Sequence, residues 1–268
     1  MAPNSCEEPS MPYSLFRCLL RLIFSAAILA LCSGSAASAE TLRVALSPDY
    51  EPIAFERDGR LVGIEVDNAH EVGKILGRKI KFVQVRQADY IDALNKGRVD
   101  VVMSGFSVTP DREAQVAFTA PFMQIGQMAI ILSEKASQFG PPRALFEKGV
   151  RIVVEPGTTG ETYVRANYPA AIVITHPDPD IAFAALRAGE ADAYIHDAPT
   201  SWLLASTREN RDLLSLYRPL TQENLAWAVR KENVELLAQL NDALVEIRAS
   251  GRLSAIQSYW ITVTVEVQ

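Results

Sequence analysis

Nine consecutive residues, Ser104 to Arg112, hold the side chains best suited to bind a small anion. Ser104 and Ser107 offer hydroxyl groups, and Gly105 lets a ligand approach the backbone closely. Arg112 offers a planar guanidinium that can bind both oxygens of a carboxylate. We therefore predict a carboxylate site in this segment, and a surface helix cap with a solvated arginine is the alternative.

The start of a helix is predicted inside the same segment. Thr109 and Pro110 are typical of the N-cap and the first position of a helix, which places Arg112 in its first turn. The N–H groups at a helix start carry partial positive charge and favour anions. The strand-like run Val99 to Met103 comes directly before the segment and should position it.

A second helix start is predicted at Gly157-Thr158-Thr159-Gly160-Glu161. Thr158 is a candidate N-cap, and Glu161 three residues later would complete a capping box. The backbone N–H groups and hydroxyls of Thr158 and Thr159 suit a carboxylate, although the motif could serve as a cap alone.

Asp197 follows the strand-like run Ala191 to His196 and could accept hydrogen bonds from an ammonium group. A turn cap before Ala198 is the alternative. Arg112 and Asp197 together would bind a zwitterion, since hydrogen bonds to charged groups contribute about 1.5 to 3 kcal/mol each. Tyr50 could supply an aromatic wall for the ligand's side chain.

Motifs for metal binding or catalysis are not evident. The three histidines, His70, His176 and His196, lack metal-ligand spacing, and no nucleophile elbow, phosphate loop or dinucleotide fingerprint occurs. We expect no metal, no cofactor and no catalytic residue.

The first 39 residues resemble a secretory signal. Arg17 and Arg21 precede the apolar run 22–32, and the small residues that follow suggest cleavage after Ala39 and a periplasmic location. An apolar run of 11 residues is shorter than the ~20 that cross a bilayer. Met11 is an alternative start.

Composition restricts the partners further. The 3 cysteines all lie in the leader, so we expect no disulfide, and a bulky leucine before Cys32 favours a soluble exported protein over a lipoprotein. The net charge of −6 excludes nucleic acid as an expected partner. We expect a monomer.

Short apolar runs alternate with helical patterns from Thr41 onward, which predicts an α/β fold with parallel strands. The helix Val66 to Leu76 should end at Gly77, and two C-terminal helices, 234–247 and 253–260, should be separated at Gly251. The predicted strands are Leu42–Leu46, Ile80–Val85, Val99–Met103, Met128–Leu132, Arg151–Val154, Ala171–Thr175, Ala191–Ile195 and Leu225–Val229.

A faint internal repeat suggests two similar lobes. Residues 93–100 are echoed by 185–192, and the strand 44–48 is echoed by 152–156. Chance is the alternative, because joints of helix, glycine and strand are common. The loops with candidate site residues follow the strands, where open α/β sheets bind ligands.

The chain resembles the periplasmic solute-binding proteins of polar amino acid transporters over nearly all of residues 41–261. This resemblance implies two α/β lobes joined by a two-stranded hinge, the type II periplasmic-binding-protein fold. We expect residues 40–132 and 224–268 in the first lobe and 133–223 in the second. The segments that carry the resemblance are 61–67, 104–112, 116–122, 157–161 and 191–194.

The resemblance also implies roles for the site residues. Arg112 is expected to bind the ligand's carboxylate, assisted by Ser107, Thr158 and nearby N–H groups. Asp197 is expected to bind its ammonium, together with the Gly105 carbonyl and the Ser107 hydroxyl. The full set of expected ligand-binding residues is Tyr50, Ser104, Gly105, Ser107, Arg112, Thr158, Thr159 and Asp197.

Four further positions are expected to affect specificity: Ser47, Gln87, Glu155 and His196. Ser47 stands where many relatives have an acid, and Gln87 where a second aromatic is common. A buried carboxylate at Glu155 would favour a ligand with a cationic or amide side chain.

The expected function is capture of a polar amino acid for an inner-membrane ABC permease, with a basic or amide side chain favoured. One alternative on the same fold is a periplasmic cyclohexadienyl dehydratase acting on prephenate or arogenate, in which Glu155 or another cleft acid donates a proton. Another is a ligand-sensing partner of a membrane receptor.

Overall fold

The computed structural model describes residues 40–141, 143–216 and 218–261, which lie in one compact unit. The expected signal segment, its cleavage point and the cysteines fall outside the described residues. Within those ranges, no helix is both long and apolar enough to cross a membrane.

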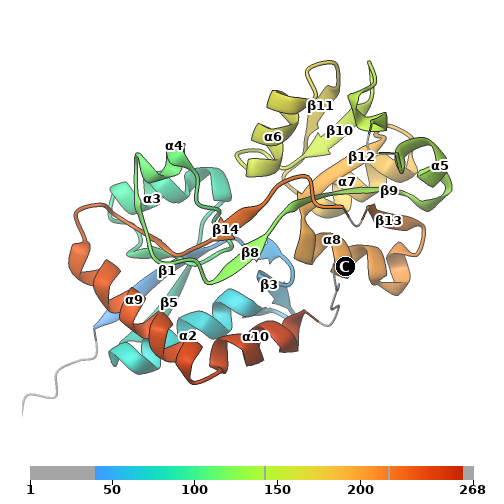
Figure 1. The fold of residues 1–268 in the computed structure, drawn as a ribbon. Helices are drawn as coiled ribbons and strands as arrows, with labels where there is room; N and C mark the ends of the chain where they lie inside the picture. Colours follow the sequence, from blue (N-terminus) through green and yellow to red (C-terminus); the bar gives the residue numbers. More distant parts are fainter. Residues whose placement is uncertain (1–39, 142, 217, 262–268) are drawn as a thin grey trace, which may run out of the picture. The chain divides into compact units, whose positions relative to one another are not determined.

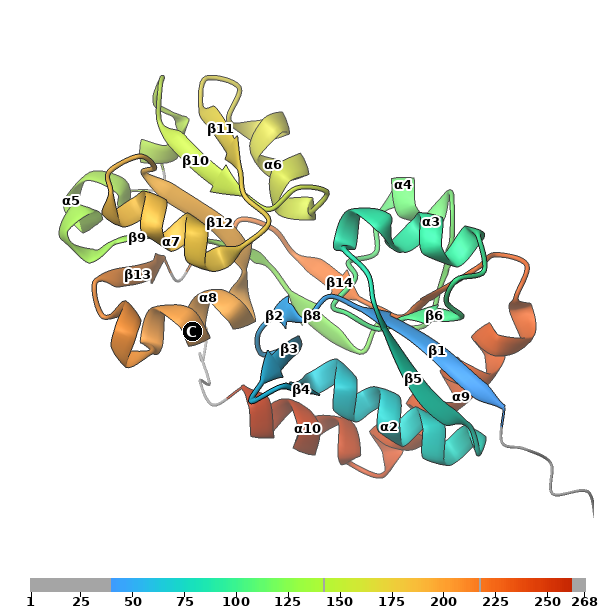
Figure 2. The same cartoon turned by 180° about the vertical axis from the view of Figure 1, so that it is seen from behind.

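The first sheet has five strands in the order β5 (Lys79–Gln84), β1 (Thr41–Leu46), β6 (Val101–Val102), β15 (Ala228–Val229) and β7 (Ala117–Phe118). β1 is parallel to both β5 and β6, whereas β15 is antiparallel to β6 and β7. Figure 2 shows β1 and β5 side by side.

Helices cover both faces of this sheet. The helices α2 (Ile64–Leu76), α9 (Val234–Ala249) and α10 (Arg252–Trp260) contact one another below it (Figure 1). Side chains of α2, α9 and α10 share one core cluster with Val44 of β1, while the neighbouring Ala45 packs in another cluster. β1 is therefore buried on both faces, which explains its nearly continuous apolar sequence.

The second sheet has the strand order β11 (Ile172–Thr175), β10 (Arg151–Val154), β12 (Ala193–Asp197), β9 (Gln127–Leu132) and β13 (Leu213–Leu216). β10 is parallel to β11 and β12, and β9 is antiparallel to β12 and β13. Three longer helices belong to this lobe: α6 (Thr159–Asn167), α7 (Pro179–Arg187) and α8 (Ala198–Ser206).

The remaining elements are short. They are β2 (Asp49–Tyr50), β3 (Ala54–Arg57), β4 (Arg60–Val62), α3 (Tyr90–Asn95), α4 (Pro110–Glu113), β8 (Met123–Ile125), α5 (Ala136–Phe139), β14 (Glu223–Leu225) and the 3-10 turns Gln87–Asp89, Ser133–Lys135, Ala144–Phe146 and Arg208–Asn210.

The internal repeat is realised as the same polar contact in each sheet. In the first lobe, Arg43 donates to the Asp100 carboxylate from its backbone N–H (2.8 Å) and its guanidinium, which also reaches the Gly97 carbonyl. In the second lobe, Arg151 contacts Asp192 and the Gly189 carbonyl in the same way. The repeated sequence therefore encodes a repeated α/β unit.

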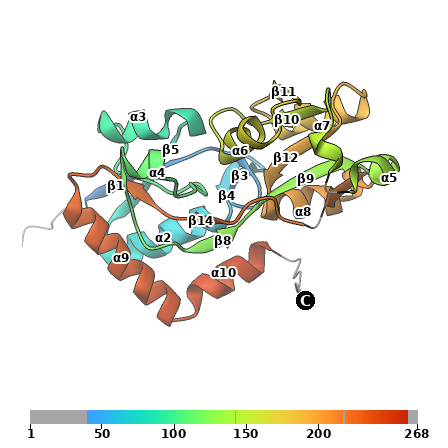
Figure 3. The ribbon, with the colours of Figure 1, turned by 45° about the horizontal axis from the view of Figure 1, so that its top comes forward.

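Two antiparallel strands, β8 and β14, connect the two lobes (Figure 3). The expected first boundary at residue 132 is wrong, because β9 already pairs with β12 and β13 in the second sheet. The chain leaves the first lobe at β8, and only Gly126 separates β8 from β9.

The expectation of parallel strands is confirmed for β1 with β5 and β6 and for β10 with β11 and β12, but the strands β9 and β15 depart from it. β9 and β15 follow the two crossings between lobes, so each enters its sheet from the opposite direction and pairs antiparallel. Both sheets are mixed for this reason.

The predicted helix boundaries are confirmed where capping residues were evident. α2 ends at Gly77, whose backbone is left-handed (φ 63°), and Gly251 (φ 73°) separates α9 from α10. Thr109 caps α4, and Thr158 caps α6 by accepting the Glu161 N–H. Glu161 in turn accepts from the Gly157 N–H at 2.8 Å.

Candidate functional site

A narrow cleft lies where loops after the strands of both lobes meet. About 10 Å³ of it is open to the centre of a water-sized sphere, which is room for about one water molecule. Its lining residues are Tyr50, Gln87, Gly105, Ser107, Gln127, Glu155, Thr158, Thr159, Ile195, His196 and Asp197.

Most of the expected site residues meet in this cleft. The exceptions are Ser47, Ser104 and Arg112, which are not among its lining residues. Ser104 is buried behind the cleft, where its Oγ accepts from the Ser47 N–H (3.1 Å) and from the Tyr90 hydroxyl (2.7 Å). Ser47 and Ser104 therefore support the loops of the first lobe in this structure.

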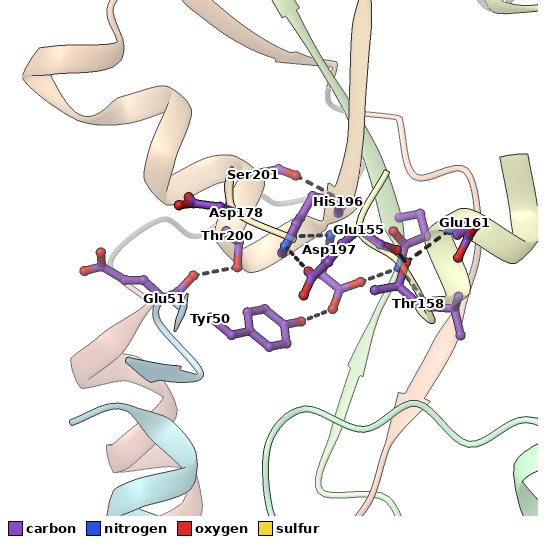
Figure 4. A network of polar contacts seen from close by, with 12 residues as sticks. Tyr50, Glu51, Glu155, Thr158, Glu161, Asp178, His196, Asp197, Thr200 and Ser201 are labelled. Atoms are coloured by element: carbon purple, nitrogen blue, oxygen red, sulfur yellow. Dashed lines mark hydrogen bonds and ion pairs between the residues drawn. The ribbon is translucent and has the colours of Figure 1, made fainter. Parts of the chain in front are cut away.

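Asp197, the last residue of β12, occupies the centre of the cleft. Its carboxylate accepts hydrogen bonds from the Tyr50 hydroxyl of the first lobe and from the Gln127 side-chain amide (Figure 4 shows the Tyr50 contact). Burial of the carboxylate, with a smaller contribution from the charge of Glu223, raises the pKa of Asp197 well above its usual range. A cationic ligand group that reached Asp197 would relieve this cost.

His196 and Glu155 form a pair on the wall of the cleft (Figure 4). His196 Nδ1 accepts the Asp197 backbone N–H at 2.8 Å, so its Nε2 carries the proton in the neutral ring. That Nε2 lies 3.6 Å from a Glu155 carboxylate oxygen, and the Tyr50 ring packs edge-on against the imidazole. The pair offers the cleft a second carboxylate, which lies beside a proton-bearing imidazole nitrogen.

Arg112 is held at the edge of the cleft by backbone carbonyls. Its guanidinium donates to the Ser107 carbonyl (2.8 Å) and, across the lobes, to the Gly157 carbonyl (3.1 Å). It also lies 4.0 Å from the centre of the Phe106 ring. Burial lowers the pKa of Arg112 to about 10, against the opposing effect of Glu223.

A buried carboxylate holds Gly105 in place. Glu65 accepts the Gly105 N–H (3.1 Å) and the Trp227 indole N–H (2.9 Å). Burial raises the pKa of Glu65 to about 7, although these hydrogen bonds lower it. Gly105 is left-handed (φ 63°), and a Cβ there would lie 2.7 Å from the Tyr50 ring, so glycine is required for the ring to cover the cleft.

Gln127 is a site residue that sequence reasoning missed. It lies directly opposite Asp197 in the pairing of β9 with β12, and its amide also donates to Thr159 Oγ1 at 3.1 Å. Gly160 leaves room for it, because a Cβ there would lie 2.8 Å from Gln127 Oε1. No local signal could have found Gln127, because only the strand register places it beside Asp197.

Glu223, on β14 of the hinge, was missed as well. Its carboxylate accepts the hydroxyls of Ser107, Thr159 and Thr221, each at 2.7 Å. It follows no strand of either main sheet, so its position in the sequence does not mark it as a polar residue at a strand end.

The cleft is therefore rich in hydrogen-bond acceptors and suited to a ligand with N–H groups. Asp197 and Glu155 are acidic, and the lining contains no lysine or arginine among the residues described. No group of three or more metal-ligating side chains occurs in the described part of the chain.

Curated relatives of this chain include both binding proteins and an enzyme. The chain is 31% identical over 197 residues to the cyclohexadienyl dehydratase of Pseudomonas aeruginosa, covering 70% of this chain and 73% of that protein. It is 28% identical over 222 residues to the L-cystine-binding protein TcyJ of Escherichia coli, covering 82% of each.

Solved structures with a similar fold include amino acid-binding proteins. An ancestral amino acid-binding protein, a precursor of cyclohexadienyl dehydratase, has a TM-score of 0.77 and 31% identity, covering 82% of this chain and 95% of that one. An ancestral arginine-binding protein bound to arginine has a TM-score of 0.76 and 30% identity, covering 82% and 97%.

These similarities confirm the two-lobed type II fold, in agreement with the two sheets and the β8–β14 connection. The family model described as bacterial extracellular solute-binding proteins, family 3, matches residues 42–263, which include both lobes and every residue of the cleft. Because the match extends over the whole two-lobed unit, this chain belongs to the bacterial extracellular solute-binding proteins of family 3.

Proposed function

We propose that this protein captures a polar amino acid in the periplasm and delivers it to an inner-membrane ABC permease. The observation that carries the proposal is the Asp197 carboxylate, which accepts from the Tyr50 hydroxyl of the other lobe in a narrow polar cleft. An α-ammonium group would take the place of the Tyr50 hydroxyl on Asp197. Contacts to both lobes would then favour the closed arrangement.

A basic side chain is the favoured ligand feature. Asp197 is sufficient for the α-ammonium, which leaves the Glu155 carboxylate, beside His196, for a second cationic or N–H-bearing group. Relatives named as arginine-binding proteins of Escherichia coli support this choice, at 28% identity and 90% coverage of this chain.

Arg112 would bind the ligand's carboxylate after a change in its hydrogen bonds. Its guanidinium already lies beside Ser107 and the Gly157 loop, and a carboxylate is a stronger acceptor than the Gly157 carbonyl that it contacts now. Exchange of the Gly157 carbonyl for the ligand's carboxylate would bring the guanidinium toward the cleft.

A thermal-shift screen against the twenty common amino acids and L-cystine tests the proposal. A ligand that binds only the folded state raises the melting temperature, by mass action. We expect the largest rise in melting temperature with L-arginine, L-lysine or L-glutamine. Calorimetry then measures the affinity for the amino acid that gives it. No shift with any of them would contradict the proposal.

The second candidate function is a cyclohexadienyl dehydratase. It is favoured by the Glu155–His196 pair, in which a carboxyl group in a cleft lies 3.6 Å from a proton-bearing imidazole nitrogen, and by the 31% identity to such an enzyme. Incubation with prephenate and arogenate, followed by detection of the aromatic product, distinguishes the two functions. Turnover abolished by Glu155→Gln would establish the enzymatic role.

A further inference from the structure

The carboxylate of Glu223 joins the two lobes through two residues that line the cleft, Ser107 and Thr159. Its Oε2 accepts the Ser107 hydroxyl from the first lobe and the Thr159 hydroxyl from the second, both at 2.7 Å. Its Oε1 accepts the Thr221 hydroxyl. Glu223 itself is half-buried and belongs to the hinge strand β14.

Both donors are fixed by their own surroundings. The backbone of Ser107 pairs with Leu225, two residues beyond Glu223, and Thr159 begins α6 while accepting from the Gln127 amide. Each hydroxyl has a single proton, and Glu223 accepts both of them. In this arrangement neither Ser107 nor Thr159 has a proton left for a ligand.

The same two hydroxyls line the cleft and are expected to bind the carboxylate of an amino acid. The guanidinium of Arg112 is close enough to Glu223 for their charges to interact, and it contacts the Ser107 carbonyl. Glu223 therefore provides a carboxylate where the ligand would bring its own. On the other side of the cleft, Tyr50 and Gln127 likewise occupy Asp197.

We propose that Glu223 is a positioning residue that acts as an internal counterpart of the ligand's carboxylate. It holds Ser107 and Thr159 together when no ligand is present, and a ligand carboxylate must displace it from both hydroxyls. The link between the lobes stands independently of the proposed function, whereas the competition with ligand rests on it.

The link is tested on the ligand-free protein with Glu223→Gln, and with Glu232→Gln as the matched control on an exposed glutamate. We expect Glu223→Gln to increase the radius of gyration in small-angle X-ray scattering. Amide hydrogen exchange in residues 104–109 and 155–161 should become at least tenfold faster. Glu232→Gln should match the wild type, and the same result for Glu223→Gln would overturn the link.

A second variant removes the two hydroxyl groups that donate to Glu223. Ser107→Ala/Thr159→Val should separate the lobes to the same extent, and adding Glu223→Gln should then change nothing further. A full additional effect of Glu223→Gln in that background would show that the residue acts elsewhere, and would overturn the assignment. This readout also decides the question if one variant folds poorly.

Competition is tested by calorimetry with L-arginine, L-lysine and L-glutamine. Glu223→Gln should bind the amino acid at least threefold more tightly than the wild type, because the competing carboxylate and its repulsion of the ligand are removed. Binding by Glu223→Gln that is equal to or weaker than that of the wild type would overturn the proposed competition between Glu223 and the ligand's carboxylate. A wild type that binds no common amino acid would contradict the proposed function, while the ligand-free measurements still decide the link.

Discussion

The negative charge of the buried Asp197 carboxylate is incompletely compensated when no ligand is present. Two neutral donors, Tyr50 and Gln127, contact its carboxylate, and its pKa is raised by burial. Neutral donors compensate a buried charge less well than a cation does. An ammonium group bound at Asp197 would therefore compensate this charge better than the two neutral donors do.

Asp197→Asn should weaken binding of the amino acid by about 100-fold, because it replaces a charge-assisted hydrogen bond by a neutral one, at a cost of about 2 to 3 kcal/mol. Its melting temperature without ligand should not fall, since a buried charge is removed. Calorimetry and thermal unfolding measure both effects, with the exposed Asp58→Asn as the control. Unchanged affinity would contradict the assignment of the ammonium site.

The raised pKa of Asp197 also predicts that binding depends on pH. The ammonium ligand binds the ionised carboxylate, so a proton competes with it, and affinity should fall as the pH is lowered through the raised pKa. Calorimetry at successively lower pH should show progressively weaker binding of the amino acid. An affinity that does not change with pH would contradict this.

Glu65 should make stability depend on pH. Its folded-state pKa of about 7 lies above the ordinary value of 4.5, so the folded protein binds the proton more tightly than the unfolded chain. This contribution is fully present below pH 4.5 and is lost as the pH rises through about 7, amounting to about 3 kcal/mol.

Urea unfolding of the wild type and Glu65→Gln between pH 5 and 8 measures this contribution. The free energy of unfolding of the wild type should decrease over that interval relative to the variant, whose residue 65 does not titrate. Parallel curves for the two proteins would contradict the shift.

At the scale of the elements, each of the two repeated units positions its strands through the same contact between an aspartate and an arginine. Asp100 and Asp192 each accept both the backbone N–H and the guanidinium of an arginine on the neighbouring strand. Each contact fixes the start of the parallel pair that leads to the cleft. The capped starts of α4 and α6 then place Ser107 and Thr159 beside each other.

Because the contacts are equivalent, Asp100→Ala and Asp192→Ala should destabilise the protein by a similar amount, about 2 to 3 kcal/mol each. Urea unfolding measures the loss, with Asp242→Ala, at an exposed position of α9, as a control. A loss in only one lobe would show that the two contacts are not equivalent.

Helix ends were the elements most readily predicted. Gly77, Gly251, Thr109 and Thr158 end or begin helices as expected, because capping depends on residues within one turn. Strand direction and the boundary near residue 132 were not predictable, because Met128 to Leu132 is apolar whichever sheet it joins. Sheet membership depends on partners about 65 or more residues away.

At the scale of the whole molecule, the cleft is lined by residues of both lobes and contacted from the hinge. Tyr50 and Ser107 come from the first lobe and Asp197 from the second. Glu223 of β14 contacts the Ser107 hydroxyl from outside the lining. Contacts that cross between lobes, such as Arg112 to the Gly157 carbonyl, make closure and binding interdependent.

A bound amino acid should therefore stabilise both lobes together. At a ligand concentration 100 times the Kd, mass action adds about 2.7 kcal/mol to the free energy of unfolding. Amide exchange should slow in segments 104–112 and 155–161 at the same time. Protection confined to one lobe would contradict a shared site.

The sequence by itself determined the α/β units, their repetition, the helix starts and the residues after the strands that could bind an amino acid. These features depend on residues close together in the chain, or on patterns that recur along it. Only the tertiary structure decided that Gln127 faces Asp197 and that Glu223 joins Ser107 to Thr159. It also decided that Arg112 donates to backbone carbonyls, because a guanidinium takes the acceptors that folding brings within reach, and no local pattern specifies which ones those are.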